Sequence, residues 1–302
     1  MPGARLDFSC AARAEIGRAL AHLPAGDQFL SSVATACHLG NPVKFGAVET
    51  LIRHGLLAPN LIIDGNTMLQ TVCLHGQNAW TWVENSLTLE QRLTSLLALG
   101  ARIDHPALPA IDLLQQTWER DDADGHLAAA ALIANGCDPL QRDEQHRTLL
   151  HRAAGTGNIP VLRGWQRAGL AMDLTAGDQG NTALHIAASN GQHEALRFLI
   201  TEGTVAINTL NLESETALHL AVLHSHIEAA RALLELQASP DFTDRNGLTP
   251  LFIADFQRSA PLRALLVQHG ADPRAHDSRP SRNRNADDWY QHFHGHPWPD
   301  AN

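Results

Sequence analysis

The chain has 302 residues, and its 22 lysines and arginines against 32 aspartates and glutamates give a formal net charge of −10. This charge argues against nonspecific binding to nucleic acid or to an anionic membrane, because both require a basic protein surface. Hydrophobic residues make up 44% of the chain and charged residues 18%, so the chain can bury a core and is not a disordered polymer.

The N-terminal part of the chain is expected to contain pairs of helices joined by long connections. In the second pair the connection covers residues 77–87, after which Thr88 and Gln91 predict a capping box at the start of the next helix. Cys37 and Cys73 occupy the same slot in successive first helices. Better-defined pairs downstream carry alanine or valine in this slot, so both cysteines are expected to fill buried space rather than to bind a ligand.

Residues 103–142 are expected to form one more helix pair. The segment HLAAAALIAN from His126 predicts its second helix, and GCDP from Gly136 matches GADP from Gly270 at the end of the last pair. The first helix, near ALPAIDLLQQTW, has no clear register. This pair is therefore inferred mainly from its C-terminal half.

A repeated pattern organises residues 143–273. Four segments share a threonine, an apolar run and small residues at helical spacing: RTLLHRAAGTGN, NTALHIAASNGQ, ETALHLAVLHSH and LTPLFIADFQRS. The threonines are 34, 34 and 33 positions apart: Thr148, Thr182, Thr216 and Thr249. Each threonine predicts an N-capped first helix. In the first two segments Gly157 and Gly191 stand where this helix is expected to end. A second amphipathic helix follows, and because one pair cannot bury its apolar face alone, the pairs must stack.

This pattern resembles the ankyrin repeat, whose signature is close to D-x-x-G-x-T-P-L-H-x-A-A-x-x-G-H followed by V-x-x-L-L-x-x-G-A-D. The best matches are DQGNTALHIAASNGQ from Asp178 and DRNGLTPLFIADFQ from Asp244, with GADP from Gly270. The resemblance implies an all-α solenoid of about seven helix-turn-helix units. The expected segments are a helical cap at 1–26, an array at 27–273 with units at 27–60, 61–102, 103–142, 143–177, 178–210, 211–243 and 244–273, and a tail at 274–302.

The threonine and histidine of each unit have a structural role in this family. The threonine caps the first helix, and the histidine bonds to it and to neighbouring backbone, which links consecutive units. The matching pairs are Thr148 with His151, Thr182 with His185, and Thr216 with His219, while Phe252 replaces the histidine in the last unit. A hydroxyl and an imidazole three positions apart share one helix face and could suggest catalysis, but the capping role explains them better.

The resemblance also implies that the functional surface is the concave side, formed by hairpin tips and by the exposed face of the first helices. The matching partner-binding positions are Arg152, Ile186, Asn190, Glu213, Glu215, Leu220, Leu223, His224, Arg245, Ile253, Phe256 and Gln257. Four of them are expected to form an exposed apolar cluster: Leu220, Leu223, Ile253 and Phe256. Such a cluster marks a binding site, unless the C-terminal tail folds back over it.

Charge suggests the chemistry of the partner. Residues 178–273 contain eleven acidic residues and five arginines. An acidic array favours a partner with a basic surface, mainly through the association rate and the choice of partner. The alternative is that these charges serve only solubility.

The C-terminal tail holds His292, His294 and His296 among several aromatic residues. On an extended strand these three imidazoles would share a face and could approach a zinc or nickel ion. Gly295 and Pro297 disfavour a regular strand, so the preferred interpretation is that the aromatic residues cap the last unit. No metal and no other cofactor is therefore expected.

The sequence favours a non-enzymatic protein that binds another protein. It contains no P-loop, GxSxG, HExxH or paired-carboxylate motif. Its composition suggests a bacterial source, where it would act as a toxin-neutralising immunity protein or as an effector delivered into another cell by a specialised secretion system. The rival is an enzyme or metal protein that uses the loop at 77–87, the acidic loop at 119–125 or the tail.

The expected location is cytoplasmic. The N-terminus lacks a continuous apolar segment of the kind that directs export, and no run of about 18 apolar residues is present. The four cysteines are widely spaced, which is typical of a reduced compartment. Neither a membrane nor a nucleic acid is expected as a partner.

Overall fold

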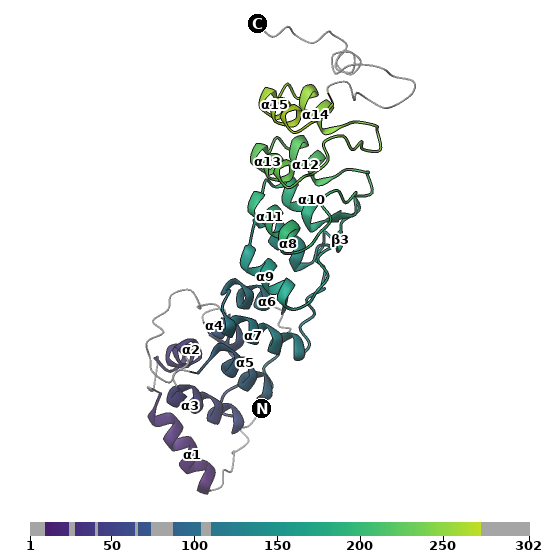
Figure 1. The fold of residues 1–302 in the computed structure, drawn as a ribbon. Helices are drawn as coiled ribbons and strands as arrows, with labels where there is room; N and C mark the ends of the chain where they lie inside the picture. Colours follow the sequence, from purple (N-terminus) through teal and green to yellow (C-terminus); the bar gives the residue numbers. More distant parts are fainter. Residues whose placement is uncertain are drawn as a thin grey trace. The chain divides into compact units, whose positions relative to one another are not determined.

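The computed structural model describes residues 10–23, 28–39, 42–63, 66–73, 87–103 and 110–272. These residues are mainly helical and include two short antiparallel hairpins (Figure 1). The chain divides into two compact units, residues 1–139 and 140–302. None of the described helices is long and apolar enough to cross a membrane.

In the first unit the helices pair in chain order. They are α1 (Cys10–Ala21), α2 (Phe29–Leu39), α3 (Pro42–Arg53), α4 (Met68–Cys73), α5 (Leu89–Ala98), α6 (Ala110–Glu119) and α7 (Ala123–Ala134), with the hairpin β1 (Ile62–Ile63) and β2 (Asn66–Thr67) before α4. The first helices α2, α4 and α6 contact one another in a row, and α1, α3, α5 and α7 form a second row. The segment whose register was open in the sequence forms α6, which buries Leu114 and Trp118.

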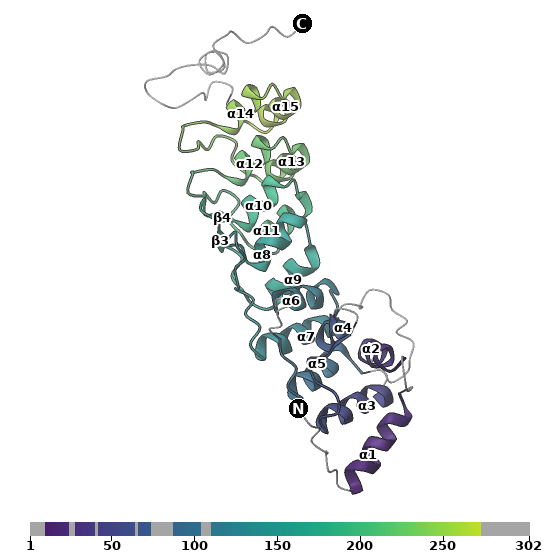
Figure 2. The same ribbon diagram turned by 180° about the vertical axis from the view of Figure 1, so that it is seen from behind.

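The second unit repeats the same plan. Its elements are α8 (Leu149–Thr156), α9 (Ile159–Arg167), β3 (Thr175–Ala176), β4 (Asn181–Thr182), α10 (Ala183–Ser189), α11 (His193–Thr201), α12 (Ala217–Leu223), α13 (Ile227–Glu235), α14 (Pro250–Phe256) and α15 (Ala260–Gln268). The first helices α8, α10, α12 and α14 form one row, and the second helices α9, α11, α13 and α15 form another. The connecting hairpins all extend on the side of the first helices (Figures 1 and 2).

Local sequence explains where the first helices of the second unit begin and end. The four predicted threonines are their N-caps. Gly157, with a φ of 73°, ends α8, and Gly191, with a φ of 72°, follows α10. Ala154 and Ala188 are completely buried between the helices, where a small side chain lets neighbouring backbones approach closely. The predicted capped helices are thus confirmed.

The last helix pair differs from the preceding ones at two buried slots. Asp255 occupies the slot filled by the completely buried Val222 on α12, and Arg263 occupies the slot of the completely buried Ala230 on α13. The two side chains form an ion pair, with Asp255 Oδ1 2.8 Å from Arg263 Nε. Both slots are thus polar in this pair, whereas the preceding pairs of the second unit fill them with buried apolar side chains.

Replacing Gln237 with glycine is expected to stabilise the second unit by about 1 kcal/mol, because Gln237 follows α13 with a φ of 71°, a conformation that side chains disfavour. Gly169 and Gly270 occupy the equivalent positions after α9 and α15. Urea denaturation followed by circular dichroism measures the change. The matched control, Gly270→Gln, should destabilise by a similar amount, since nothing lies within 4 Å of a Cβ built at Gly270. A loss of stability in Gln237→Gly would contradict this account.

Candidate binding surface

Three buried histidines join consecutive helix pairs in the second unit. His151 Nδ1 lies 2.9 Å from Thr148 Oγ1 and 3.2 Å from the Thr148 backbone nitrogen. On its other side, His151 Nε2 donates to the carbonyl oxygen of Leu174, at 2.8 Å, in the segment that leads into the next hairpin. The predicted linking role of the histidine is therefore confirmed, and the ring has both nitrogens engaged inside the protein.

The same arrangement recurs in the next two pairs. His185 Nε2 donates to Glu215 O at 3.0 Å, and His219 Nε2 donates to Leu248 O at 3.2 Å. All three rings are completely buried. Burial lowers the pKa of each ring, because the charged imidazolium is poorly solvated there. The last pair carries the buried Phe252 instead, and Thr249 Oγ1 still accepts from its backbone nitrogen at 3.2 Å.

The hairpin tips of the second unit stack on one another. The backbone nitrogen of Leu212 donates to Gln179 O, and that of Arg245 donates to Glu213 O, both at 2.9 Å. Arg245 Nη1 and Glu213 Oε2 also form an ion pair across the tips at 2.5 Å. The tips therefore form a continuous ridge that runs beside the first helices.

The partner-binding residues predicted from the sequence lie on this ridge, on the first helices α8, α10, α12 and α14, and at the C-caps of α10, α12 and α14. The exposed ones are Asn190, Leu223, His224 and Arg245, and the half-buried ones are Arg152, Ile186, Glu213, Glu215, Ile253, Phe256 and Gln257. Some of them also hold the array together: Gln257 Nε2 donates to Leu223 O at 2.7 Å, and Glu215 Oε2 accepts from Asn211 Nδ2 at 2.9 Å.

The expectation that Leu220 is exposed is wrong. Leu220 is only 5% exposed, whereas Leu223, one helical turn later on α12, is 44% exposed. A step of three residues turns a side chain by about 60° around the helix axis, which is enough to move it from the open face toward a neighbouring helix. The exposed apolar positions of this face are therefore Leu223 with the half-buried Ile253 and Phe256.

Leu212 is an exposed apolar residue that the predicted set left out. It is 72% exposed at its hairpin tip, and its side chain lies over Gly180 of the preceding tip. The available signal was an apolar residue at a tip position where the neighbouring tips carry Asp178 and Arg245.

A model of ankyrin repeats matches the chain in three overlapping copies, at residues 123–209, 163–244 and 184–277, which together cover just over half of it. The chain belongs to the ankyrin-repeat family. Ankyrin repeats mediate protein–protein interaction, and proteins built from them are typically binding modules without enzymatic activity. No curated protein matched the chain.

The acidic loop at 119–125, which suggested a rival enzymatic site, has a structural role next to the ankyrin repeats. Asp122 caps α7 and accepts from the Gly125 backbone nitrogen at 2.6 Å. Asp124 accepts from the first two backbone nitrogens of α5, Leu89 N at 2.7 Å and Glu90 N at 3.1 Å. These carboxylates are thus engaged in helix capping.

Some of the candidate metal-binding residues lie in the part of the chain that the structure describes, and others lie outside it. Among the residues that the structure describes, no group of three or more histidine, cysteine or acidic side chains could hold a metal ion. Cys37 and Cys73 are buried, and burial raises the pKa of each thiol to about 12, which supports the predicted filler role. The histidines of the tail and residues 77–86 of the long loop lie outside the described residues.

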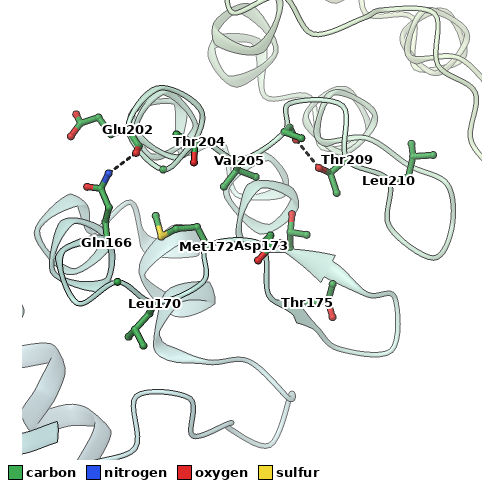
Figure 3. Close-up of a pocket in the computed structure, with 14 residues that line it drawn as sticks. Gln166, Leu170, Met172, Asp173, Thr175, Glu202, Thr204, Val205, Thr209 and Leu210 are labelled. Carbon is green, nitrogen blue, oxygen red and sulfur yellow. Dashed lines mark hydrogen bonds between the residues drawn. The ribbon is translucent and has the colours of Figure 1, made fainter. Parts of the chain in front are cut away.

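A cavity of about 700 Å³ opens between the loops that follow α9 and α11 (Figure 3). Gln166 Nε2 donates to Glu202 O at 2.5 Å, and Thr209 Oγ1 donates to Ala206 O at 2.7 Å. The first bond joins neighbouring ankyrin repeats, and the second lies within one loop. The residues that line the cavity are thus part of the contact between repeats, and Met172 points toward the centre of the cavity.

Proposed function

We propose that the chain is a non-enzymatic module of about seven ankyrin repeats, with a helical N-terminal cap, that holds another protein against the tip ridge and the first helices of residues 140–272. The observation that carries this proposal is the apolar face made by Leu223, Ile253 and Phe256 on two neighbouring first helices. Large side chains left accessible beside one another are typical of an interface, because their exposure to water is unfavourable.

The internal contacts support the same surface. The buried Thr–His pairs and the alanines between helices explain how the repeats stack, whereas Leu223 and Leu212 contribute little to the core. The apolar side chains of Leu223 and Leu212 thus remain available to a partner, whereas polar residues of the same surface such as Gln257 and Glu213 also join neighbouring repeats. The cytoplasmic location, the bacterial source and the immunity or effector role remain predictions from the sequence.

Replacing Leu223 and Phe256 together with aspartate is expected to abolish capture of the partner. Aspartate removes apolar contact area and adds charge that would have to lose water in the interface. Affinity capture from cells that express the protein, followed by mass spectrometry, compares proteins retained by the unaltered chain and by the double variant. Leu223 is 44% exposed and Phe256 is half-buried, so the thermal midpoint should change little.

Val267→Asp is the matched control, because Val267 is 37% exposed on the second helix α15, away from the first helices. It should retain the same proteins as the unaltered chain. If the double variant also retains them at an unchanged melting temperature, the proposed face is wrong.

A further inference from the structure

The apolar face has a spacing that a partner must match. Leu223 and Phe256 occupy equivalent positions on the neighbouring helices α12 and α14, seven residues after Thr216 and Thr249. Packed helices lie about 8 to 10 Å apart, so the two side chains should be separated by a similar distance along the array.

This separation favours a helical occupant. On an α-helix, residues i and i+7 share a face and are about 10.5 Å apart along the axis. On an extended strand, residues on one face are about 6.7 Å or 13 Å apart, so no pair of same-face positions matches a spacing near 10 Å. Ile253 lies on α14 one turn before Phe256, so it widens the apolar face along α14 and gives a second apolar residue of the partner helix a contact.

The charge beside this face is negative. Residues 178–273, which include both helices of the face, contain eleven acidic residues and five arginines. Four of these arginines pair with carboxylates of the same stretch: Arg197 with Glu235, Arg231 with Glu228, Arg245 with Glu213 and Arg263 with Asp255. The acidic positions of the ridge in this stretch are Asp178, Glu213, Glu215 and Asp244. Arg245 is the one basic residue in these hairpin tips between residues 177 and 247, and it forms an ion pair with Glu213.

We infer that the partner presents an amphipathic α-helix, with apolar residues at i, i+3 or i+4 and i+7 and with lysine or arginine along the edge that faces the tip ridge. The apolar residues meet Leu223, Ile253 and Phe256, and the basic residues meet the ridge carboxylates. Such helix-in-groove recognition uses the apolar anchors for affinity and the charges for partner choice. This inference rests on the proposed function.

The inference is tested with a displayed library of 20-residue peptides, selected for binding to the purified full chain. The fixed positions of the peptides carry residues that favour an α-helix, and the surface positions are randomised. Bound clones are counter-selected on the Leu223→Asp, Phe256→Asp double variant, so that only sequences that depend on this face remain. The expected survivors carry a net positive charge and apolar residues at helical spacing. Each should bind the double variant at least tenfold more weakly than the unaltered chain. Glu213→Gln should weaken them, whereas Glu194→Gln, on the second helix α11, should not.

Several results would overturn the inference. They are survivors without a positive charge bias, apolar residues at a spacing of two, or no clone that depends on Leu223 and Phe256. Survivors that resemble residues 274–302 would assign the face to the chain's own C-terminal segment instead. If capture of the natural partner still depends on Leu223 and Phe256, the proposed function stands and only the helical, basic partner is wrong.

Discussion

Lowering the pH from 7.5 to 5.5 is expected to reduce the free energy of unfolding of the second unit by up to about 4 kcal/mol. Burial lowers the pKa of His151, His185 and His219 in the folded protein, whereas the unfolded chain has the ordinary value near 6.5. Below that value the unfolded state binds more protons than the folded state, so stability falls as the pH falls. Each ring contributes up to about 1.4 kcal/mol over this interval. Urea denaturation at several pH values measures the slope.

His219→Gln tests the assignment of this slope to the histidines. Gln70 occupies the equivalent slot on α4, where its side-chain oxygen accepts from the Thr67 backbone nitrogen, so glutamine can complete the same capping box. The variant should lose about a third of the pH dependence. Relative to the unaltered chain it should be destabilised at pH 7.5, where the bond from His219 Nε2 to Leu248 O is lost, and less destabilised at pH 5.5. Parallel curves for the variant and the unaltered chain would show that these rings do not cause the effect.

Asp124→Ala is expected to destabilise the first unit by about 3 kcal/mol. The substitution removes the carboxylate that accepts from Leu89 N and Glu90 N, so the first turn of α5 keeps only the capping box of Thr88 and Gln91. It also removes the negative charge that favours the protonated form of Arg92. Arg92 is only 8% exposed, and its burial lowers its pKa. Removing the counter-charge of a buried ion is costly because the remaining charge stays poorly solvated. Denaturation followed by circular dichroism, with hydrogen exchange to locate the change, measures the effect.

Asp122→Ala is the matched control for that substitution. Asp122 caps α7 and pairs with Arg120 at 3.0 Å, and its side chain is 48% exposed. Its loss should cost about 1 kcal/mol, the usual value of an N-cap. Equal losses in both variants would mean that Asp124 acts only as a cap and does not stabilise Arg92.

Much of the helical pairing could be predicted from the sequence because its signals are local. A threonine cap, the histidine three positions later and a left-handed glycine act within one helix and its ends, as Thr148, His151 and Gly157 do. The register of α6 could not be predicted, because the segment lacks both the threonine that caps α8, α10, α12 and α14 and the glycine that follows α8 and α10. Its position follows instead from burial of Leu114 and Trp118 against neighbouring helices.

The candidate surface was only partly predictable, for a related reason. The sequence placed its residues on tips and first helices, but helical position alone did not separate the buried Leu220 from the exposed Leu223. It also gave no indication that Glu213 pairs with Arg245 of the next tip. Both features depend on how neighbouring repeats pack.

The amino-acid sequence by itself determined the repeat period, the capped helices, the family and the excess of negative charge, because each depends on residue identity or on neighbours a few positions away. Only the tertiary structure decided which apolar side chains remain open to a partner, which carboxylates cap distant helices and which charges neutralise one another. Asp124 reaches α5, and Arg197 reaches Glu235, across more than thirty positions. Such contacts depend on the stacking of whole helices, and no local pattern in the chain specifies them.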